Sequence, residues 1–151
     1  MFTGISDVAL DAKGRLAIPS KYRPAISAFE DNRFHLTIDN ADPCLLIYPH
    51  TDWERFSAEI FARKTGNPRV RRLYRLYIAH HAPCELDAQF RMLIPAELRE
   101  FAGLEKNVVL VGQGRRFELW DAQLWKQKRL QWMQQEAEEI EGNSVIDDLM
   151  I

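Results

Sequence analysis

The sequence predicts a β-rich α+β fold built from two copies of one structural unit, with a helical hairpin between the copies and a helix near the C-terminal end. The first observation is a repeat, because residues 10–23 (LDAKGRLAIPSKYR) and 86–99 (LDAQFRMLIPAELR) match at seven of fourteen positions. The second is an echo after each copy, in which 45–48 with Trp53 correspond to 117–120 with Trp125. Two matches in the same order at similar offsets indicate a duplicated unit.

The repeated stretch opens each unit, and it predicts a tight β-hairpin around the turn at residues 11–15. Alternating apolar residues lie before and after this turn, as is typical of half-buried strands. Asp11, and Asp87 in the second copy, are interpreted as turn-forming residues that accept hydrogen bonds from backbone amides. Gly14 can adopt a positive φ without steric cost, so it suits the end of the turn.

The rest of each unit predicts a short helix followed by another hairpin. Pro19 removes a backbone donor and ends the strand, and a helix is expected from Ser20 to about Ala28. Its counterpart covers 96–102, and Gly103 ends it as a C-cap residue. The hairpins that follow are expected to pair 34–38 with 44–48 and 108–111 with 115–120.

Residues 51–81 predict a helical hairpin between the two units. Apolar residues recur at helical spacing on both sides of Gly66-Asn67-Pro68, and Asp52 is expected to be the first N-cap. The second helix is crowded with arginine, at positions 69, 71, 72 and 75. We interpret these arginines as a solvated face or as partners in salt bridges to a neighbour, and a DNA-facing patch is the alternative.

A C-terminal helix is expected from Asp121 to about Glu141. Trp125 and Trp132 are seven residues apart and so share one face of this helix. We expect that face to take part in packing between subunits. Residues 142–151 have no clear periodicity.

These motifs resemble the MraZ family, bacterial transcriptional regulators built from two AbrB-like swapped-hairpin repeats. The resemblance rests on the Asp-x-Lys-Gly-Arg turn, its second copy, and the segments 44–49 (CLLIYP) and 111–120 (VGQGRRFELW), and it weakens only after about Glu136. It implies that the repeats form a double-split β-barrel. The expected organisation is repeat 1 at 1–53, the helical hairpin at 54–81, repeat 2 at 82–125, and the C-terminal helix with an acidic tail at 126–151.

The resemblance also implies function: binding of double-stranded DNA, assembly into ring-like homo-oligomers, and control of the division and cell-wall gene cluster through repeated promoter boxes. It assigns DNA contact to Lys13 and Arg15 and the turn role to Gly14, which we count with the DNA-binding residues. Arg91 keeps its place in the second copy, although Gln89 lacks a charge and Phe90 replaces glycine. A bulky residue disfavours positive φ, so the second turn is expected to differ in geometry. The alternative to DNA contact is that Arg15 and Arg91 serve only the structure of their turns, by pairing with Asp11 and Asp87.

Charge and targeting signals agree with this assignment without establishing it. The formal net charge is −2, and residues 134–151 carry six acids and no bases. The body is therefore mildly basic, which is compatible with DNA binding through local contacts. A signal-like N-terminus and an apolar run long enough to span a membrane are both lacking, so a cytoplasmic, nucleoid-associated protein is expected.

No enzyme signature is recognisable, and neither a cofactor nor a small-molecule substrate is expected. His80, His81 and Cys84 are the densest set of metal ligands, but a structural zinc site needs a second pair. Cys44 begins an apolar strand and is a poor nucleophile there. The segment 112–116 lacks the Lys-Ser/Thr of a phosphate-binding loop.

The sequence therefore predicts a non-enzymatic, sequence-specific transcriptional regulator. One arginine bound to a guanine discriminates by about 1–3 kcal/mol, whereas regulators need about 4–10 kcal/mol over non-specific DNA. Several turns must act together, as they do in a homo-oligomer on repeated boxes. The alternative is an oligomeric scaffold whose arginine turns bind an acidic protein partner.

Overall fold

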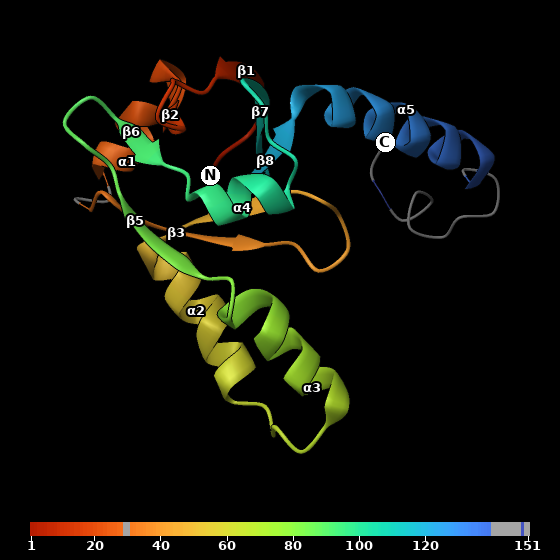
Figure 1. The fold of residues 1–151 in the computed structure, drawn as a ribbon. Helices are drawn as coiled ribbons and strands as arrows, with labels where there is room; N and C mark the ends of the chain where they lie inside the picture. The colour runs from red at the N-terminus through yellow and green to blue at the C-terminus, as the bar shows by residue number, and fades with distance from the viewer. Residues whose placement is uncertain (29–30, 140–148, 150–151) are drawn as a thin grey trace. The chain divides into compact units, whose positions relative to one another are not determined.

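The computed structural model describes residues 1–28, 31–139 and 149 (Figure 1). The chain divides into two compact units, 1–121 and 122–151. All the strands among the described residues lie in the first unit. Its main sheet is antiparallel, with strands in the order β1 (Ile5–Ala9), β7 (Asn107–Gly112), β8 (Phe117–Asp121), β4 (Leu45–Pro49), β3 (Arg33–Ile38) and β5 (Ala82–Glu85). A second, two-stranded sheet pairs β2 (Arg15–Ala17) with β6 (Arg91–Leu93).

The two sequence copies exchange their first strands. β1 pairs with β7 of the second copy, with Ile5 opposite Val111, and β5 pairs with β3 of the first copy, with Arg33 opposite Glu85. The predicted tight hairpin between β1 and β2 is therefore wrong, because these strands belong to different sheets. The turn between them lets each strand satisfy its backbone groups on an edge supplied by the other copy.

The remaining contacts between the copies follow the same two-fold pattern. β2 pairs with β6, and β4 pairs with β8, so equivalent strands of the two copies lie side by side at both places. The main sheet is open, since its end strands β1 and β5 do not pair with each other in the described part of the chain. The observed fold is thus a β-rich α+β fold with an open antiparallel sheet, and the expected closed barrel is not observed.

The two later hairpins of the units are confirmed. β3 pairs with β4 and β7 pairs with β8, each in antiparallel register. Both strands of the first hairpin are buried almost throughout, which fits their continuous apolar sequence. Together with apolar side chains of the two-stranded sheet they form one core, whose fully buried members include Leu16, Ile18, Leu36, Ile47, Met92, Ile94, Leu110 and Leu119.

The short helices also occur where they were predicted. In the first copy a 3₁₀ turn, η1 (Ser20–Tyr22), leads into α1 (Arg23–Ala28), and in the second copy α4 (Ala96–Phe101) follows Pro95. Gly103 takes a φ of +62°, and its N–H donates to the carbonyl of Glu100 at 3.1 Å. This geometry is a glycine C-cap.

The helical hairpin between the copies consists of α2 (His50–Phe61), α3 (Pro68–Leu73) and a π-helical turn, η2 (Tyr74–Ile78). The prediction of Asp52 as N-cap is wrong: the N-cap of α2 is Pro49, three residues earlier, and it makes no side-chain cap. α3 is capped instead by Asn67, whose side chain accepts a hydrogen bond from the N–H of Arg69 at 2.8 Å. Pro68 follows the cap, at a position where its missing N–H costs no helical bond.

The second unit contains α5 (Ala122–Glu139), which confirms the predicted C-terminal helix as far as the structure describes it. The rings of Trp125 and Trp132 meet edge to face, with centroids 5.6 Å apart. Residues 140–148, 150 and 151, with most of the acidic tail, lie outside the described residues. None of the helices in the described ranges is long and apolar enough to cross a membrane.

Candidate nucleic-acid interface

The first arginine-bearing turn is organised by the carboxylate of Asp11. Its Oδ1 accepts hydrogen bonds from the backbone N–H groups of Lys13 and Arg15, each at 2.9 Å. Its Oδ2 accepts from Nε of Arg15 at 2.6 Å. The N–H of Gly14 donates to the carbonyl of Asp11 at 2.9 Å, and the N–H of Asp11 donates to the carbonyl of Arg15 at 3.1 Å. One carboxylate therefore fixes both the turn backbone and the base of the arginine side chain.

The second turn repeats this arrangement bond for bond. Oδ1 of Asp87 accepts from the N–H groups of Gln89 and Arg91, each at 2.9 Å, and Oδ2 accepts from Nε of Arg91 at 2.9 Å. The N–H of Phe90 donates to the carbonyl of Asp87 at 3.0 Å. The two copies thus present the same turn, although only seven of their fourteen residues match.

The expected difference in the second turn is not observed. Phe90 adopts a φ of +57°, and it is the only described residue other than glycine with positive φ. Gly14, at the same place in the first turn, has a φ of +82°. The bonds to Asp87 hold Phe90 in this unfavourable region, and its ring lies 5.2 Å from the guanidinium of Arg23. Hydrogen bonds and ring contacts together outweigh the steric preference.

The two turns are tied to each other across the small sheet. The N–H of Ile18 donates to the carbonyl of Phe90 at 2.9 Å, and the N–H of Ile94 donates to the carbonyl of Gly14 at 3.0 Å. Arg99 fills the space beside Gly14, where an added Cβ would lie 2.6 Å from its Cζ, and its Nε donates to the carbonyl of Ile94 at 3.0 Å. The relative position of the turns is therefore fixed by backbone hydrogen bonds.

The register of this sheet puts both arginines on one face. Arg15 lies opposite Leu93, and Arg91 lies opposite Ala17, so the two arginines are diagonal neighbours. Leu16 and Met92, between them, are fully buried on the other face. The side chains of Arg15 and Arg91 are each about a third exposed. The structure thus brings together two arginines that are 76 residues apart in sequence.

The electrostatics of the turns leave part of each guanidinium available. In the first turn, the N–H and the side chain of Arg15 lower the pKa of Asp11 to about 2. Bonds from Arg91 and Gln89 likewise lower the pKa of Asp87. Each arginine is bound through Nε, and its Nη nitrogens make no hydrogen bond within the described residues. A guanidinium has five N–H donors, so each side chain can still bind an acceptor with two or more donors.

In the part of the chain that the structure describes, the two turns contain no group of three potential metal ligands. Among the described residues, one group of three metal-binding side chains lies close together, namely Asp39, Cys44 and Glu118, which is not the His80, His81 and Cys84 set considered from sequence. Burial raises the pKa of both the Cys44 thiol and the Glu118 carboxyl. Burial therefore favours the protonated forms, which bind cations poorly.

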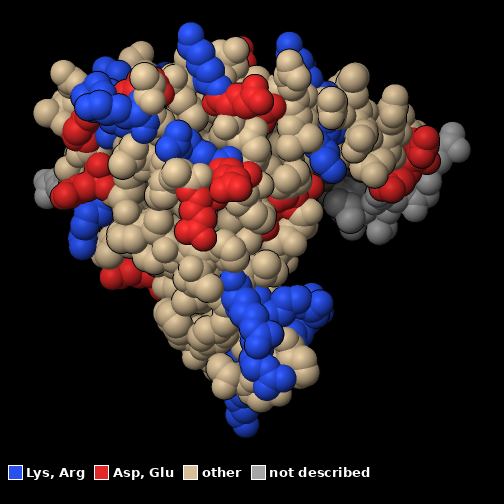
Figure 2. Space-filling model, viewed as in Figure 1, with Lys and Arg blue, Asp and Glu red and all other residues tan. Residues whose placement is uncertain are grey.

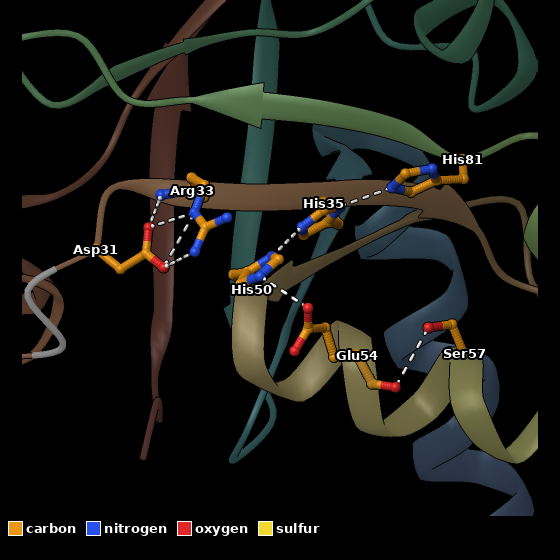
Figure 3. Close-up of polar contacts among 7 residues, drawn as sticks. All are labelled: Asp31, Arg33, His35, His50, Glu54, Ser57 and His81. Carbon is orange, nitrogen blue, oxygen red and sulfur yellow. Dashed lines mark hydrogen bonds and ion pairs between the residues drawn. The ribbon is translucent and has the colours of Figure 1, made fainter.

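Sequence reasoning missed a chain of three histidines. Nδ1 of His35 lies 2.7 Å from Nε2 of His81, and Nε2 of His35 lies 2.8 Å from Nδ1 of His50 (Figure 3). Nε2 of His50 in turn lies 3.0 Å from a carboxylate oxygen of Glu54. Three neutral histidines can make all of these hydrogen bonds. In that arrangement Nε2–H of His81 donates to His35, Nε2–H of His35 donates to His50, and Nε2–H of His50 donates to Glu54. These residues are far apart in sequence and form no spacing motif, so only the fold reveals the cluster.

These observations define a class: a duplicated β protein whose copies exchange strands and present two arginine-bearing turns on one face. A family model described as "MraZ protein, putative antitoxin-like" matches residues 1–76 and 78–145. The chain belongs to the MraZ family.

Curated relatives agree over nearly the full length of the chain. The sequence is 44% identical over 151 residues to the transcriptional regulator MraZ of Thioalkalivibrio sulfidiphilus, covering 100% of both chains. It is 44% identical to that of Alkalilimnicola ehrlichii, covering 99% of this chain and 97% of the relative. It is 42% identical to that of Legionella pneumophila (strain Corby), covering 94% and 93%. These relatives are named for regulation of transcription and not for catalysis.

Proposed function

We propose that this protein is a transcriptional regulator that binds double-stranded DNA in a sequence-specific manner. The names of its relatives support regulation of transcription. The observation that carries the proposal is the shared face of Arg15 and Arg91 on the β2–β6 sheet. Two partly exposed guanidiniums, each held at one end by a carboxylate, suit recognition of base edges or phosphates better than recognition of an apolar surface.

In this proposal the DNA-binding residues are Lys13, Gly14, Arg15 and Arg91. Arg15 and Arg91 bind guanine edges or phosphates through their Nη groups, and Lys13, which is exposed, binds a phosphate. Gly14 contributes through the turn itself, because its φ of +82° sets the backbone that places Lys13 and Arg15 at the proposed interface. Asp11 and Asp87 do not touch DNA; they orient the arginines and shape the turns.

One such pair of arginines gives too little discrimination for a regulator, so we propose that several chains act together. Two bidentate contacts are worth roughly 2–6 kcal/mol, against the 4–10 kcal/mol that specific sites typically require. A ring-like homo-oligomer supplies further turns and raises their effective concentration. In this proposal it binds repeated promoter boxes of the cell-division and cell-wall gene cluster. The protein would then act in the cytoplasm, associated with the nucleoid.

The strand exchange supports the finer architecture that we propose. The units at 1–53 and 82–125 would be AbrB-like swapped-hairpin repeats. The segment 54–81 would be an inserted helical hairpin, and 126–151 would form a C-terminal helix and acidic tail. Pairing of β1 with β7 and of β5 with β3 is the pattern that exchange between two such repeats produces.

The test is DNA binding by Arg15→Ala and Arg91→Ala variants, measured by fluorescence anisotropy on the DNA upstream of the protein's own gene and on scrambled DNA of equal length. Arg15→Ala should lower affinity for the upstream DNA by about 5- to 150-fold, which corresponds to a loss of about 1–3 kcal/mol. Arg33→Ala is the matched control, because Arg33 is also paired with an aspartate, Asp31, at 3.0 Å but lies on β3.

Size-exclusion chromatography shows whether each variant keeps its assembly. If Arg15→Ala retains full affinity for the upstream DNA, the arginine turns do not read it. The alternative scaffold, in which they bind an acidic protein, would then be preferred.

A further inference from the structure

The helical hairpin carries a concentration of positive charge that is separate from the two arginine-bearing turns. Residues 60–84 contain six lysines and arginines and no aspartate or glutamate. Four of the arginines lie on or directly after α3, and we call them the α3 basic face: Arg69, Arg71, Arg72 and Arg75. Figure 2 shows lysine and arginine gathered over the end of unit 1 where Figure 1 places α3, with no acidic side chain among them in that view.

Among the described residues, the arginines of the α3 basic face have no acidic partner. All four are exposed, and none makes an ion pair within the described residues. Their one side-chain bond is weak, from Nη1 of Arg71 to the carbonyl of Thr65 at 3.4 Å. Of the two readings given from sequence, a solvated face therefore agrees with the part of the chain that the structure describes, and salt bridges are not observed there.

The helix that carries the α3 basic face is held in place by contacts with the rest of unit 1. Arg71 and Arg75 are four residues apart and Arg72 and Arg75 are three apart, so these side chains are neighbours on one side of the helix. The other side packs through its tyrosines: Tyr77 meets Phe56 edge to face at 5.0 Å. The carbonyl of Tyr77 accepts a hydrogen bond from Thr37 of the central sheet at 2.6 Å. The charges are thus presented by an anchored helix.

The arginine turns, in contrast, contribute less net charge, because residues 11–15 carry a formal charge of +1 and residues 87–91 carry none. Asp11 offsets Arg15, and Asp87 offsets Arg91, so the turns can discriminate between bases without attracting the duplex strongly. The whole chain has a formal charge of −2. Affinity for DNA depends largely on lysines and arginines that neutralise phosphates. On the two turns, Lys13 is the residue proposed to bind a phosphate as an unpaired cation, so further unpaired cations on another surface would add to the affinity for DNA.

We propose that the α3 basic face is a second DNA contact, which binds backbone phosphates without reading sequence. The inference rests on the proposed DNA binding of the chain and adds a distinct surface to it. Arginine suits this role because its planar fork donates two hydrogen bonds to one phosphate. In Figure 1 the β2–β6 sheet and α3 lie at opposite ends of unit 1, so α3 contacts phosphates away from the base pairs read by the turns. Loss of these contacts weakens binding to all DNA equally.

An acidic segment of a second copy is the competing occupant, since residues 134–151 carry six acids. The guanidinium preference for phosphate and the presence of a DNA-reading surface in the same unit favour DNA. The two occupants differ in a measurable way. Phosphate contacts set the salt dependence of DNA affinity, whereas contacts with another copy set the assembly state.

The experiment uses the full chain with Arg71→Gln, Arg72→Gln and Arg75→Gln combined. Affinity for upstream and scrambled DNA is measured from about 50 to 200 mM KCl, and log K is plotted against log salt concentration. Each phosphate contact contributes about −0.9 to the slope of log K against log salt concentration. The slope of the triple variant should therefore be less negative than that of the wild type by roughly 2 to 3. Affinity should fall by the same factor on both DNAs, leaving their ratio unchanged.

Two controls separate charge from folding. The variant with Arg55→Gln, Lys126→Gln and Lys128→Gln removes the same net charge elsewhere and should keep the wild-type slope. The triple lysine variant, R71K/R72K/R75K, keeps the charges and should recover most of the slope. If the triple glutamine variant keeps the wild-type slope, the inference is wrong. If it keeps that slope but no longer assembles, the α3 basic face binds the acidic segment of a second copy instead of DNA.

Failure of the proposed function is distinguishable from failure of this inference. Wild-type protein that binds upstream and scrambled DNA equally would reject sequence-specific binding. If the triple variant still lost slope on both, the α3 contact would stand. Wild-type protein that binds neither DNA would overturn both proposals.

Discussion

Phe90 holds, in the second turn, the left-handed backbone conformation that Gly14 holds in the first. Its φ of +57° is strained for a residue with a Cβ, whereas the φ of +82° at Gly14 is not. The strain is retained because Asp87 binds the turn backbone and because the Phe90 ring contacts Arg23 and the edge of the core. The two turns therefore have one shape but different sources of stability.

This difference predicts that two small substitutions at Phe90 lower the free energy of unfolding by different amounts. Phe90→Ala removes the ring and keeps the strain, so it should lower the free energy of unfolding by about 1–3 kcal/mol. Phe90→Gly removes both, and it should be about 1 kcal/mol more stable than Phe90→Ala. Urea unfolding followed by tryptophan fluorescence measures both values. Equal midpoints for the two variants would show that no backbone strain is stored at this position.

Asp11→Asn should weaken the first turn and remove part of the acid sensitivity of the protein. The folded pKa of about 2 is below the ordinary value of 3.8, so the bonds of the carboxylate stabilise the protein above pH 3.8. That stabilisation is lost as the pH falls through about 2. The difference in unfolding midpoint between wild type and Asp11→Asn should shrink steadily from pH 5 to pH 2. A difference that is constant over this range would contradict the assignment.

The histidine chain predicts a loss of stability at a higher pH. Burial, with the neighbouring charges of His81 and His50, lowers the pKa of His35 from 6.5 to about 4. The unfolded chain therefore takes up a proton first, and the free energy of unfolding should fall by about 2 kcal/mol from pH 6.5 to pH 4. NMR titration of the ring protons measures the pKa directly. A His35 pKa near 6.5 would rule out the buried neutral ring.

Gly112→Ala should detach the N-terminal residues from β7. An added Cβ at Gly112 would lie 2.6 Å from the backbone nitrogen of Thr3, where no side-chain adjustment can make room. Phe2, which stacks on Phe117 with ring centroids 4.1 Å apart, would move with the backbone. We expect a loss of about 1–3 kcal/mol by urea unfolding. Gly66→Ala is the control, because nothing lies within 4 Å of its added Cβ, and it should be nearly neutral.

Much of the local structure could be predicted from sequence, because it depends on neighbouring residues. The later hairpins, the short helices after Pro19 and Pro95, and the helical hairpin all follow from apolar periodicity and from proline and glycine. Turn residues such as Asp11 are also visible as a pattern. The repeat itself was recognisable because it preserves seven of fourteen residues.

Strand partners could not be predicted, because alternation identifies a strand without saying which edge it joins. The short turn after Leu10 is typical of a hairpin, yet β1 pairs with β7, whose residues lie about 100 positions away. The left-handed Phe90 was missed for a related reason: its support comes from Asp87 and Arg23, and Arg23 belongs to the other copy. The chain of His35, His50 and His81 likewise exists only after folding.

The exchange of first strands makes each half of the chain dependent on the other for folding. A fragment holding only the first copy would lack β5 and β7, so β3 would have a bare edge and β1 would have no mate. Such a fragment could pair these strands only by exchanging them with an identical fragment, as in a domain-swapped dimer. The covalent link through the helical hairpin keeps that borrowing within a single molecule.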